Sequence, residues 1–211
     1  MKYHHGDLRA ALLEEAEKLL EQQGAEQLTL RDIARTAGVS HGAPAHHFGN
    51  KQGLFTALAV IVIGRMERQL RRALKEVDAA DRRAQLVALA TAYVDFAHEN
   101  PELFLLHTHP KLLDYSNPEF QQARTELGGL IDQVLDAACA EGWLDRDDLK
   151  AARFAFMALV RGYGEVLTGG LPHYMAETPE EGAKLVADGA LPAIELVTRS
   201  ILHPPKGFRG S

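Results

Sequence analysis

The sequence predicts an all-α protein with a small N-terminal three-helix domain and a larger C-terminal helical domain. Apolar residues recur three or four positions apart through most of the 211 residues, and no stretch alternates apolar and polar residues as a strand does. Capping residues and prolines separate these periodic segments. The apolar content of 46% fits a folded globular protein, and the length allows one or two domains.

The N-terminal region begins with two predicted helices. In the first, apolar residues form one stripe, and Gly24 ends the pattern. The stripe consists of Leu8, Leu12, Ala16 and Leu19. Thr29 to Asp32 then has the form of a capping box, in which the Thr29 hydroxyl accepts from the backbone of Asp32 and the Asp32 carboxylate reaches back. We therefore expect a second helix directly after Thr29.

A tight turn separates the second helix from a short third helix. Gly38 breaks the helical pattern, and glycine adopts the positive φ that such turns often need. Ser40 is a good N-cap for the third helix, which we expect to end near Phe48. Pro44 falls in the first turn of this helix, where its missing N–H donor does no harm. Asn50 is the expected cap of the next helix.

Two short helices joined by a glycine turn are the layout of a helix-turn-helix, a DNA-binding motif. The helix that reads DNA needs small and polar residues at its start and cations nearby for the phosphates. Residues 40–43 provide the start, and His46, His47 and Lys51 follow. An ordinary helical hairpin is the alternative, but the cap, the turn and the small residues together favour a DNA-binding domain over residues 1–50.

Residues 2 to about 60 resemble the DNA-binding domain of the TetR family of transcriptional repressors. The match lies in IARTAGVSHGAPAHHFGNKQGLF, which has the family's pattern of IA, AGVS, G, HF, K and LF. The resemblance implies an α-helical homodimer with a C-terminal ligand-binding domain. It also implies that His41, Gly42 and Ala43 face the base edges. The positions that it assigns to phosphate contacts are Thr29, Ser40, His47 and Lys51.

The chain departs from the family pattern at two places on the predicted DNA-reading face. Many members have Leu-Tyr where this chain has Pro44 and Ala45, and Ala45 lacks the tyrosine that commonly contacts phosphate. His46 is the candidate to replace that contact in part. His41 stands where members often have lysine or arginine, so the face carries less permanent charge.

These histidines predict that DNA binding depends on pH. Histidine is the side chain that gains positive charge most readily as the pH falls from about 8 to about 6, and positive charge strengthens contacts to phosphate. We expect the affinity for DNA to rise over this range in an anisotropy titration at constant ionic strength. An affinity that stays constant would contradict a DNA contact by either histidine.

The charge distribution separates this region from the rest of the chain. The formal net charge is −6, yet between residues 31 and 75 the only acidic residues are Asp32 and Glu67. A locally basic region on an acidic chain suits a regulator that binds a short DNA site. For the cations from Arg65 to Lys75 we favour a solvated helix face, because they lie beyond the DNA-reading segment.

The remaining residues are predicted to form helices separated by prolines and capping residues. A linker helix covers residues 51–77, an effector-binding and dimerisation domain covers 78–203, and a Pro/Gly-rich tail covers 204–211. A loop runs from Gly169 to Glu177. Within the domain, helices are predicted at about 82–99, 101–109, 118–141, 146–168 and 178–203.

Small residues recur at helical spacing on the last two predicted helices. They are Ala151, Ala155, Ala158 and Gly162 on one helix, and Ala183, Ala187, Ala190, Ile194, Val197 and Ile201 on the other. Such stripes let helices approach closely, so two helices from each subunit are expected to form a homodimer interface. Packing within the monomer is the alternative. The homodimer is favoured because two DNA-reading helices engage half-sites about 34 Å apart on a palindrome.

Aromatic and polar residues on the inward faces of residues 80–168 are the candidates for a small-molecule pocket. They are Tyr93, Phe96, Phe104, His107, Tyr115, Phe156, Met157, Arg161 and Tyr163. Arg161 has apolar neighbours and must find an anion or reach solvent, so we expect it to bind a ligand carboxylate or to pair with Glu165. Core packing is the alternative for each of the others.

The leading hypothesis is a ligand-responsive transcriptional repressor that binds a palindromic DNA operator as a homodimer. An unidentified small-molecule effector releases it by favouring a conformer with altered spacing of the DNA-reading helices. An activator or a constitutive DNA binder of the same fold is the alternative. A helical ligand carrier or enzyme is a third hypothesis, but no nucleophile elbow, phosphate loop or catalytic carboxylate pair supports it, so we expect no enzyme.

The sequence leads us to expect no cofactor, metal or membrane partner. Histidines two apart, such as His107 and His109, point to different helix faces, and the adjacent pairs at 4–5 and 46–47 lack further ligands. Cys139, the single cysteine, is expected to be a small buried apolar residue. We find no signal peptide and no apolar run of about 20 residues, so we expect a cytoplasmic protein.

Overall fold

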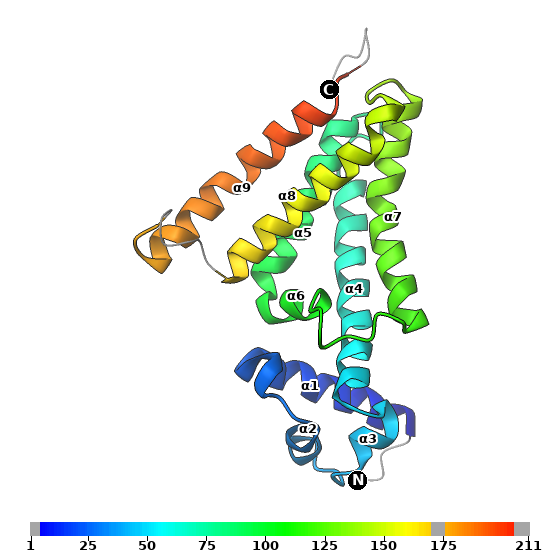
Figure 1. Ribbon diagram of the computed structural model, residues 1–211, viewed down its shortest axis with the longest axis vertical. Helices are drawn as coiled ribbons and strands as arrows, with labels where there is room; N and C mark the ends of the chain where they lie inside the picture. Colours follow the sequence, from blue (N-terminus) through cyan, green and yellow to red (C-terminus); the bar gives the residue numbers. More distant parts are fainter. Residues whose placement is uncertain (1–4, 170–175, 205–211) are drawn as a thin grey trace. The chain divides into compact units, whose positions relative to one another are not determined.

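A computed structural model describes residues 5–169 and 176–204 of the chain (Figure 1). Within these ranges every regular element is a helix, and the predicted all-α fold class is confirmed. The elements are α1 (His5–Gln27), α2 (Leu30–Thr36), α3 (Ala43–Phe48), α4 (Lys51–Lys75), α5 (Arg82–Glu99), α6 (Pro101–His107), α7 (Pro118–Ala140), the 3₁₀ turn η1 (Arg146–Asp148), α8 (Leu149–Gly169) and α9 (Pro179–Ile201). His4, most of the predicted loop (170–175) and residues 205–211 of the predicted tail lie outside the described residues.

Capping side chains fix most of the helix ends that the sequence predicted. The Asp81 carboxylate accepts from the backbone N–H of Ala84 at 2.9 Å and starts α5. The Thr178 hydroxyl accepts from the N–H of Glu181 at 3.1 Å and starts α9. The predicted end of the first helix at Gly24 corresponds to a kink, where φ is 74° and the helix resumes for one short turn.

The chain forms two compact units, of which the first comprises residues 1–64 and 102–124. In this unit α1, α2 and α3 pack on one another (Figure 1). The start of α4 belongs to the same unit and also carries buried apolar side chains. The fully buried members of this core include Leu12, Ala16, Leu20, Ile33, Leu54, Phe55 and Leu58. Phe48, at the end of α3, is half-buried.

Two hydrogen bonds attach the segment between α6 and α7 to the start of α4. The Thr56 hydroxyl, which is 2% exposed as a residue, accepts from the backbone N–H of Asp114 at 2.8 Å and donates to the carbonyl of Gln52 at 2.7 Å. The Gln52 amide donates to the carbonyl of Leu113 at 3.2 Å. The unit that holds the DNA-reading helices therefore also holds residues that the sequence assigned to the effector domain.

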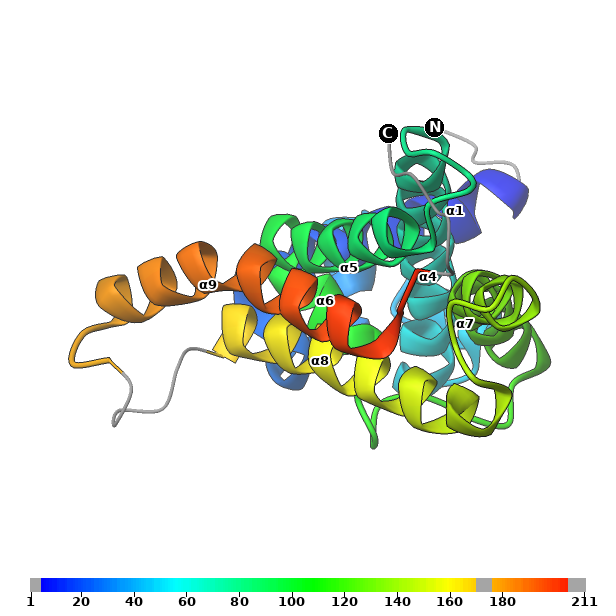
Figure 2. The same cartoon turned by 90° about the horizontal axis from the view of Figure 1, so that it is seen from above.

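The second unit comprises residues 65–101 and 125–211, and α5, α8 and α9 pack on one another in it (Figure 2). The Arg83 guanidinium donates to the carbonyl of Leu202 at 2.8 Å, which holds the C-terminal end of α9 on α5. A cation at the last carbonyls of a helix also interacts favourably with the helix dipole. Arg82 forms a two-point ion pair with Glu141 at the end of α7.

Part of the predicted dimer stripe on α9 packs inside its own subunit. On α9, Ile194 is 1% exposed, and Ala190, Val197 and Ile201 are half-buried, so the monomer alternative holds for these residues. The side chains of Ala183 and Ala187 lie outside the described ones. The outer face of α9 carries other apolar residues, which are Leu185, Leu191 and Leu196. On α8, Ala151, Ala155 and Ala158 are exposed, and Gly162 is half-buried.

Candidate nucleic-acid interface

The first helix of the helix-turn-helix motif, α2, starts with the predicted capping box. The Thr29 hydroxyl accepts from the backbone N–H of Asp32 at 3.2 Å and donates to its carboxylate at 2.5 Å. Arg35 pairs with the other carboxylate oxygen at 2.9 Å. The hydrogen bond from Thr29 lowers the pKa of Asp32 below its ordinary value, because it stabilises the charged form. The predicted phosphate contact at Thr29 is thus a hydroxyl already engaged in the cap.

Replacing Thr29 with alanine is expected to destabilise the first unit by about 1 kcal/mol, the usual worth of an N-cap. The lowered pKa of Asp32 means that its stabilisation is present above the ordinary carboxyl pKa and is lost as the pH falls through the lowered value. Urea unfolding of the variant, near neutral pH and under acid, measures both effects. Thr36→Ala is the control, because that hydroxyl bonds only to the carbonyl of Asp32 within the helix. Equal stability of Thr29→Ala and the parent would contradict the assigned cap.

The turn after α2 closes the helix by a pair of backbone hydrogen bonds. The N–H of Val39 donates to the carbonyl of Ala34 at 3.0 Å, and the N–H of Gly38 donates to Arg35 at 3.2 Å. This is the Schellman arrangement, which needs a left-handed residue after the helix. Gly38 supplies it with φ of 67°. The predicted role of Gly38 is confirmed, and the turn fixes the direction in which α3 leaves.

The start of α3 differs from the prediction at Ser40. Ser40 does not cap the helix through its side chain: the N-cap is Gly42, which makes no side-chain capping bond. The reason lies in the chain path, because residues 41 and 42 form a turn in which the carbonyl of Ser40 accepts from the N–H of Ala43 at 3.0 Å. Pro44 lies in the first turn of α3, as predicted, and is buried.

The structure brings most of the predicted base contacts to the surface at the start of α3. Ser40, His41 and Gly42 are exposed, while Ala43 is half-buried. Ala45 and His46, one turn on, are also exposed. The helix therefore presents small side chains, a hydroxyl and imidazoles to solvent at its N-terminal end, which is the end that offers backbone N–H groups to phosphates and side chains to base edges.

Two of the predicted phosphate contacts, Lys51 and His47, also make internal contacts. The Lys51 ammonium donates to the carbonyl of Glu26 at 3.0 Å and lies 5.2 Å from the centre of the Phe55 ring. Burial lowers the pKa of Lys51 from its ordinary value. His47 is half-buried and stacks on His46, with ring centres 5.6 Å apart. These contacts hold the side chains of Lys51 and His47 against other residues of the first unit.

Two exposed arginines near the motif were not among the predicted contacts. Arg31 lies in the first turn of α2. Arg9 on α1 covers the half-buried Phe48, with its guanidinium 5.3 Å from the ring centre. Matching by family position passed over both residues. In the sequence, Arg31 could have been recognised because it lies within the capping box. Arg9 could have been recognised because it is a cation on the polar side of the first helix.

The junction between α3 and α4 depends on glycine at position 53. The Asn50 side chain accepts from the N–H of Gly53 at 2.8 Å and caps α4, as the sequence predicted. A β-carbon on Gly53 would lie 2.1 Å from the carbonyl oxygen of Phe48, closer than real contacts allow. The helix that leaves the motif can therefore approach the end of α3 only because residue 53 has no side chain.

The predicted pocket residues are divided between the two units. Tyr93, Phe96 and Phe156 are buried in the second unit, and Phe104 and His107 are buried in the first. Burial raises the pKa of Tyr93 to about 12. The other candidates are the half-buried Met157 and Tyr163 and the exposed Tyr115 and Arg161.

The polar pocket candidates mostly bond within the protein. Arg161 is about half exposed and pairs with Glu165 at 2.8 Å, so the second of its two predicted alternatives holds. The Tyr163 hydroxyl donates to the carbonyl of Gly189 at 3.2 Å and links α8 to α9. The Tyr115 hydroxyl donates to the carbonyl of Thr108 at 3.2 Å. His107 contacts the carbonyl of Phe104 through Nδ1.

The described residues also bear on the expectations about metal binding, Cys139 and membrane-spanning helices. Among the described residues, histidine, cysteine and acidic side chains do not gather into a group that could hold a metal. Cys139 is half-buried rather than buried, and burial raises the pKa of its thiol. No helix in the described part of the chain has the length and apolar character needed to cross a membrane.

A capped helix, a glycine turn and a short helix with an exposed small-residue start define a helix-turn-helix regulator. Family models agree over most of the chain. The model described as bacterial regulatory proteins, tetR family, matches residues 12–58, and the one described as tetracyclin repressor-like, C-terminal domain, matches residues 86–190. The chain belongs to the TetR family of transcriptional regulators, as its sequence motifs predicted.

Individual proteins of known sequence or structure are also similar to this chain. The chain is 30% identical over 132 residues to the HTH-type transcriptional repressor AcnR of Corynebacterium diphtheriae, a match that covers 60% of this chain and 70% of that protein. A protein of unknown function from Rhodococcus sp. RHA1 is 31% identical, with a TM-score of 0.76 over 96% of this chain and 100% of that one. A TetR variant from Acinetobacter baumannii AYE in complex with minocycline shares the fold, with a TM-score of 0.63, 20% identity and coverage of 94% and 96%.

Proposed function

We propose that this TetR-family regulator is a ligand-responsive repressor that binds a palindromic operator as a homodimer. The observation that carries the proposal is the exposed N-terminal end of α3, which the α2 cap, the Gly38 turn and the Asn50 cap hold in a fixed geometry. His41 and Gly42 are proposed to meet base edges, with Ala43 beside them. The proposed phosphate contacts are Thr29, Ser40, His46, His47 and Lys51.

The proposed homodimer interface consists of the outer faces of α8 and α9. These helices have 21 and 23 residues, so each is about 30 Å long. A strip about 10 Å wide on each helix offers about 600 Å² per protomer, or about 1,200 Å² in a dimer, which reaches the range of stable interfaces. Exposed apolar side chains support this use of the surface, namely Phe154, Leu185, Leu191 and Leu196.

The proposed response to a ligand rests on family relationship and on contacts in the first unit. The fold neighbour from Acinetobacter baumannii is described in complex with minocycline, a small molecule. In this chain the hydrogen bonds from Asp114 to Thr56 and from Gln52 to Leu113 tie the α6–α7 segment to the helix that leaves the DNA-reading motif. A ligand that displaces this segment would act on α4, and it lowers DNA affinity if it favours the conformer that fits DNA less well.

A binding titration with the DNA upstream of the protein's own gene tests the proposal. We expect retardation in a gel shift, weakened by rising salt because phosphate contacts release counterions. Absence of retardation at low salt from a correctly folded protein would count against the regulator. A thermal-shift screen over apolar acids, amines and dyes identifies the effector, and its addition should release the DNA.

The alternative functions differ in how DNA binding affects transcription and in how ligands affect DNA binding. An activator raises transcription from the bound promoter in a purified transcription assay, whereas a repressor lowers it. A constitutive DNA binder keeps its affinity in the presence of every compound that shifts its melting temperature. An enzyme or ligand carrier of the same fold binds a small molecule without binding DNA. Such a function does not account for the exposed N-terminal end of α3.

A further inference from the structure

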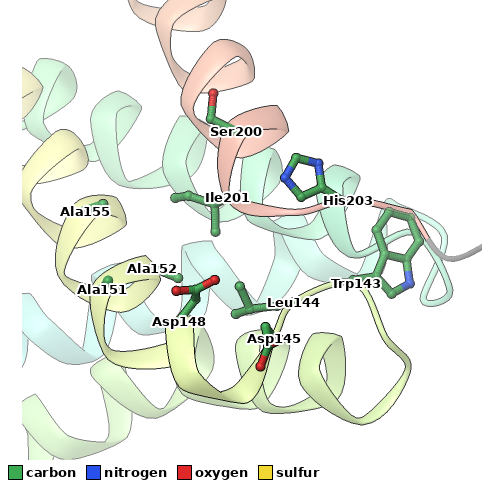
Figure 3. A pocket seen from close by; sticks show the side chains of 10 residues that line it. All are labelled: Trp143, Leu144, Asp145, Asp148, Ala151, Ala152, Ala155, Ser200, Ile201 and His203. Atoms are coloured by element: carbon green, nitrogen blue, oxygen red, sulfur yellow. The ribbon is translucent and has the colours of Figure 1, made fainter.

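A cavity of about 330 Å³ in the second unit is lined in part by Ala151 and Ala155, which belong to the exposed stripe of α8 (Figure 3). It lies between the N-terminal end of α8, the C-terminal end of α9 and the segment that joins α7 to α8. Ala151 and Ala155 of α8 face Ile201 of α9 across it, and Trp143 and Leu144 close its end. Six of the ten lining residues are apolar, three of them alanines of α8, and the polar ones are Asp145, Asp148, Ser200 and His203.

Phe154 directly precedes Ala155, which lines this cavity, but Phe154 is not one of the lining residues. The side chain is 77% exposed, the highest value among the exposed large apolar residues of the described chain. Its neighbours on the exposed side of α8 are the small residues Ala151, Ala155 and Ala158. An aromatic ring left in water next to an apolar hollow of the same chain indicates a surface that is completed by another molecule.

Two-fold symmetry allows a second copy of this chain to complete it. In a two-fold dimer each surface patch meets its own copy, so a projection and a hollow on one stripe can fill each other twice. The cavity volume of about 330 Å³ lies at the lower end of the range of about 300–1,000 Å³ typical of small-ligand pockets, which suits one aromatic ring.

Charge complementarity supports the same occupant. The carboxylates of Asp145 and Asp148 lie at the cavity rim, and both residues are exposed. Lys150, one helical turn before Phe154, is also on the accessible side of α8, at a spacing that places the two side chains on one face. A ring that enters the partner's cavity from α8 therefore brings an ammonium group toward an acidic rim.

We propose that Phe154 of each protomer inserts into the cavity that Trp143, Ala151, Ala155 and Ile201 form on the partner subunit. The proposal rests on the proposed homodimer through α8 and α9, and it names the contact that closes that interface. The two inserted Phe154 rings contribute most of the binding free energy of the dimer. Each Lys150 ammonium group faces the carboxylates of Asp145 and Asp148 at the rim of the other protomer's cavity.

Sedimentation of Phe154→Ala tests the proposal. Truncation of a buried aromatic anchor raises a dissociation constant by about 30-fold, so loss of both insertions should raise that of the dimer by about 1,000-fold. Leu105→Ala, which truncates an exposed leucine on α6 in the first unit, should leave dimerisation unchanged. Circular dichroism confirms that both variants fold, because both side chains are on the surface.

A second measurement uses Trp143, which is the only tryptophan in the chain and lines the cavity. Dilution of the parent through its dissociation constant should change the emission of Trp143 as the partner's ring leaves. In Phe154→Ala the emission should already equal that of the diluted parent. Ala155→Leu, which narrows the cavity and keeps Phe154, should also weaken the dimer, and adding it to Phe154→Ala should cost little more, because both changes remove one contact.

The outcomes separate this contact from the homodimer itself. If the parent sediments as a monomer at every concentration, the proposed dimer fails and takes the insertion with it. If the parent is a dimer and Phe154→Ala dimerises equally well with unchanged Trp143 emission, the dimer stands and the insertion is wrong. The insertion is also wrong if a small molecule rather than the partner shifts the emission of Trp143 in both proteins.

Discussion

Gly42→Glu is expected to lower the affinity for DNA at least 100-fold while the protein stays folded. Gly42 has φ of −82° and ψ of −15°, which any residue adopts, and no atom lies within 4 Å of the position of a β-carbon. A side chain is therefore tolerated in the free protein. At the exposed N-terminal end of α3, however, a glutamate occupies the space that a base edge or phosphate must reach, and its charge repels phosphate.

An anisotropy titration of the variant and the parent measures this effect, with circular dichroism and sedimentation as checks of fold and assembly. Gly129→Glu is the matched control, because that position on α7 also leaves a β-carbon free of contacts and changes the net charge equally. We expect the control to bind DNA like the parent. Similar affinities for the two variants would show that α3 does not approach DNA as proposed.

Gly53→Ala is expected to destabilise the first unit by at least about 2 kcal/mol and to weaken DNA binding with it. Alanine in a helix is ordinarily more stable than glycine by about 1 kcal/mol, so the expected sign is the reverse of the usual one. The reason is the distance of 2.1 Å between the new β-carbon and the carbonyl oxygen of Phe48. Both are fixed to the backbone, so α3 must shift away from α4, and overpacking of this kind is costly.

Urea unfolding of Gly53→Ala beside Gly129→Ala measures the difference. Gly129 has no atom within 4 Å of a β-carbon, so its replacement should be neutral or stabilising by up to about 1 kcal/mol. If Gly53→Ala is as stable as Gly129→Ala, the close approach of α4 to Phe48 is wrong. If it is destabilised but binds DNA with full affinity, the position of α3 does not depend on this junction.

Local signals were enough to predict the helices. Thr29, Asn50, Asp81 and Thr178 each cap the helix that their place in the sequence suggests, because a cap involves only groups two or three residues apart. The prediction that Ser40 caps α3 was wrong, because a cap also depends on the path of the backbone directly after it. A serine before an apolar segment is a cap only if the chain turns at once into the helix, and here a turn at residues 41–42 comes first.

The features that the sequence did not predict depend on the path of the backbone and on which face of a helix packs inward. The need for glycine at position 53 comes from the close approach of this residue to the carbonyl oxygen of Phe48, which residue types alone do not reveal. Both faces of α9 are apolar, so spacing alone did not tell that Ile194 points inward and Leu191 outward. Arg161 was singled out by its apolar neighbours in sequence, yet its side chain is exposed, whereas Phe156 and Val160 on the same helix are buried.

We propose above all that this protein binds DNA through α3 as a homodimer. The most direct test is an anisotropy titration of the parent protein with the palindrome upstream of its own gene and with a shuffled duplex of equal length and composition, at one salt concentration. We expect tighter binding to the palindrome, with two chains bound to each site. Equal affinity for both duplexes, or one chain per site at saturation, would contradict the account.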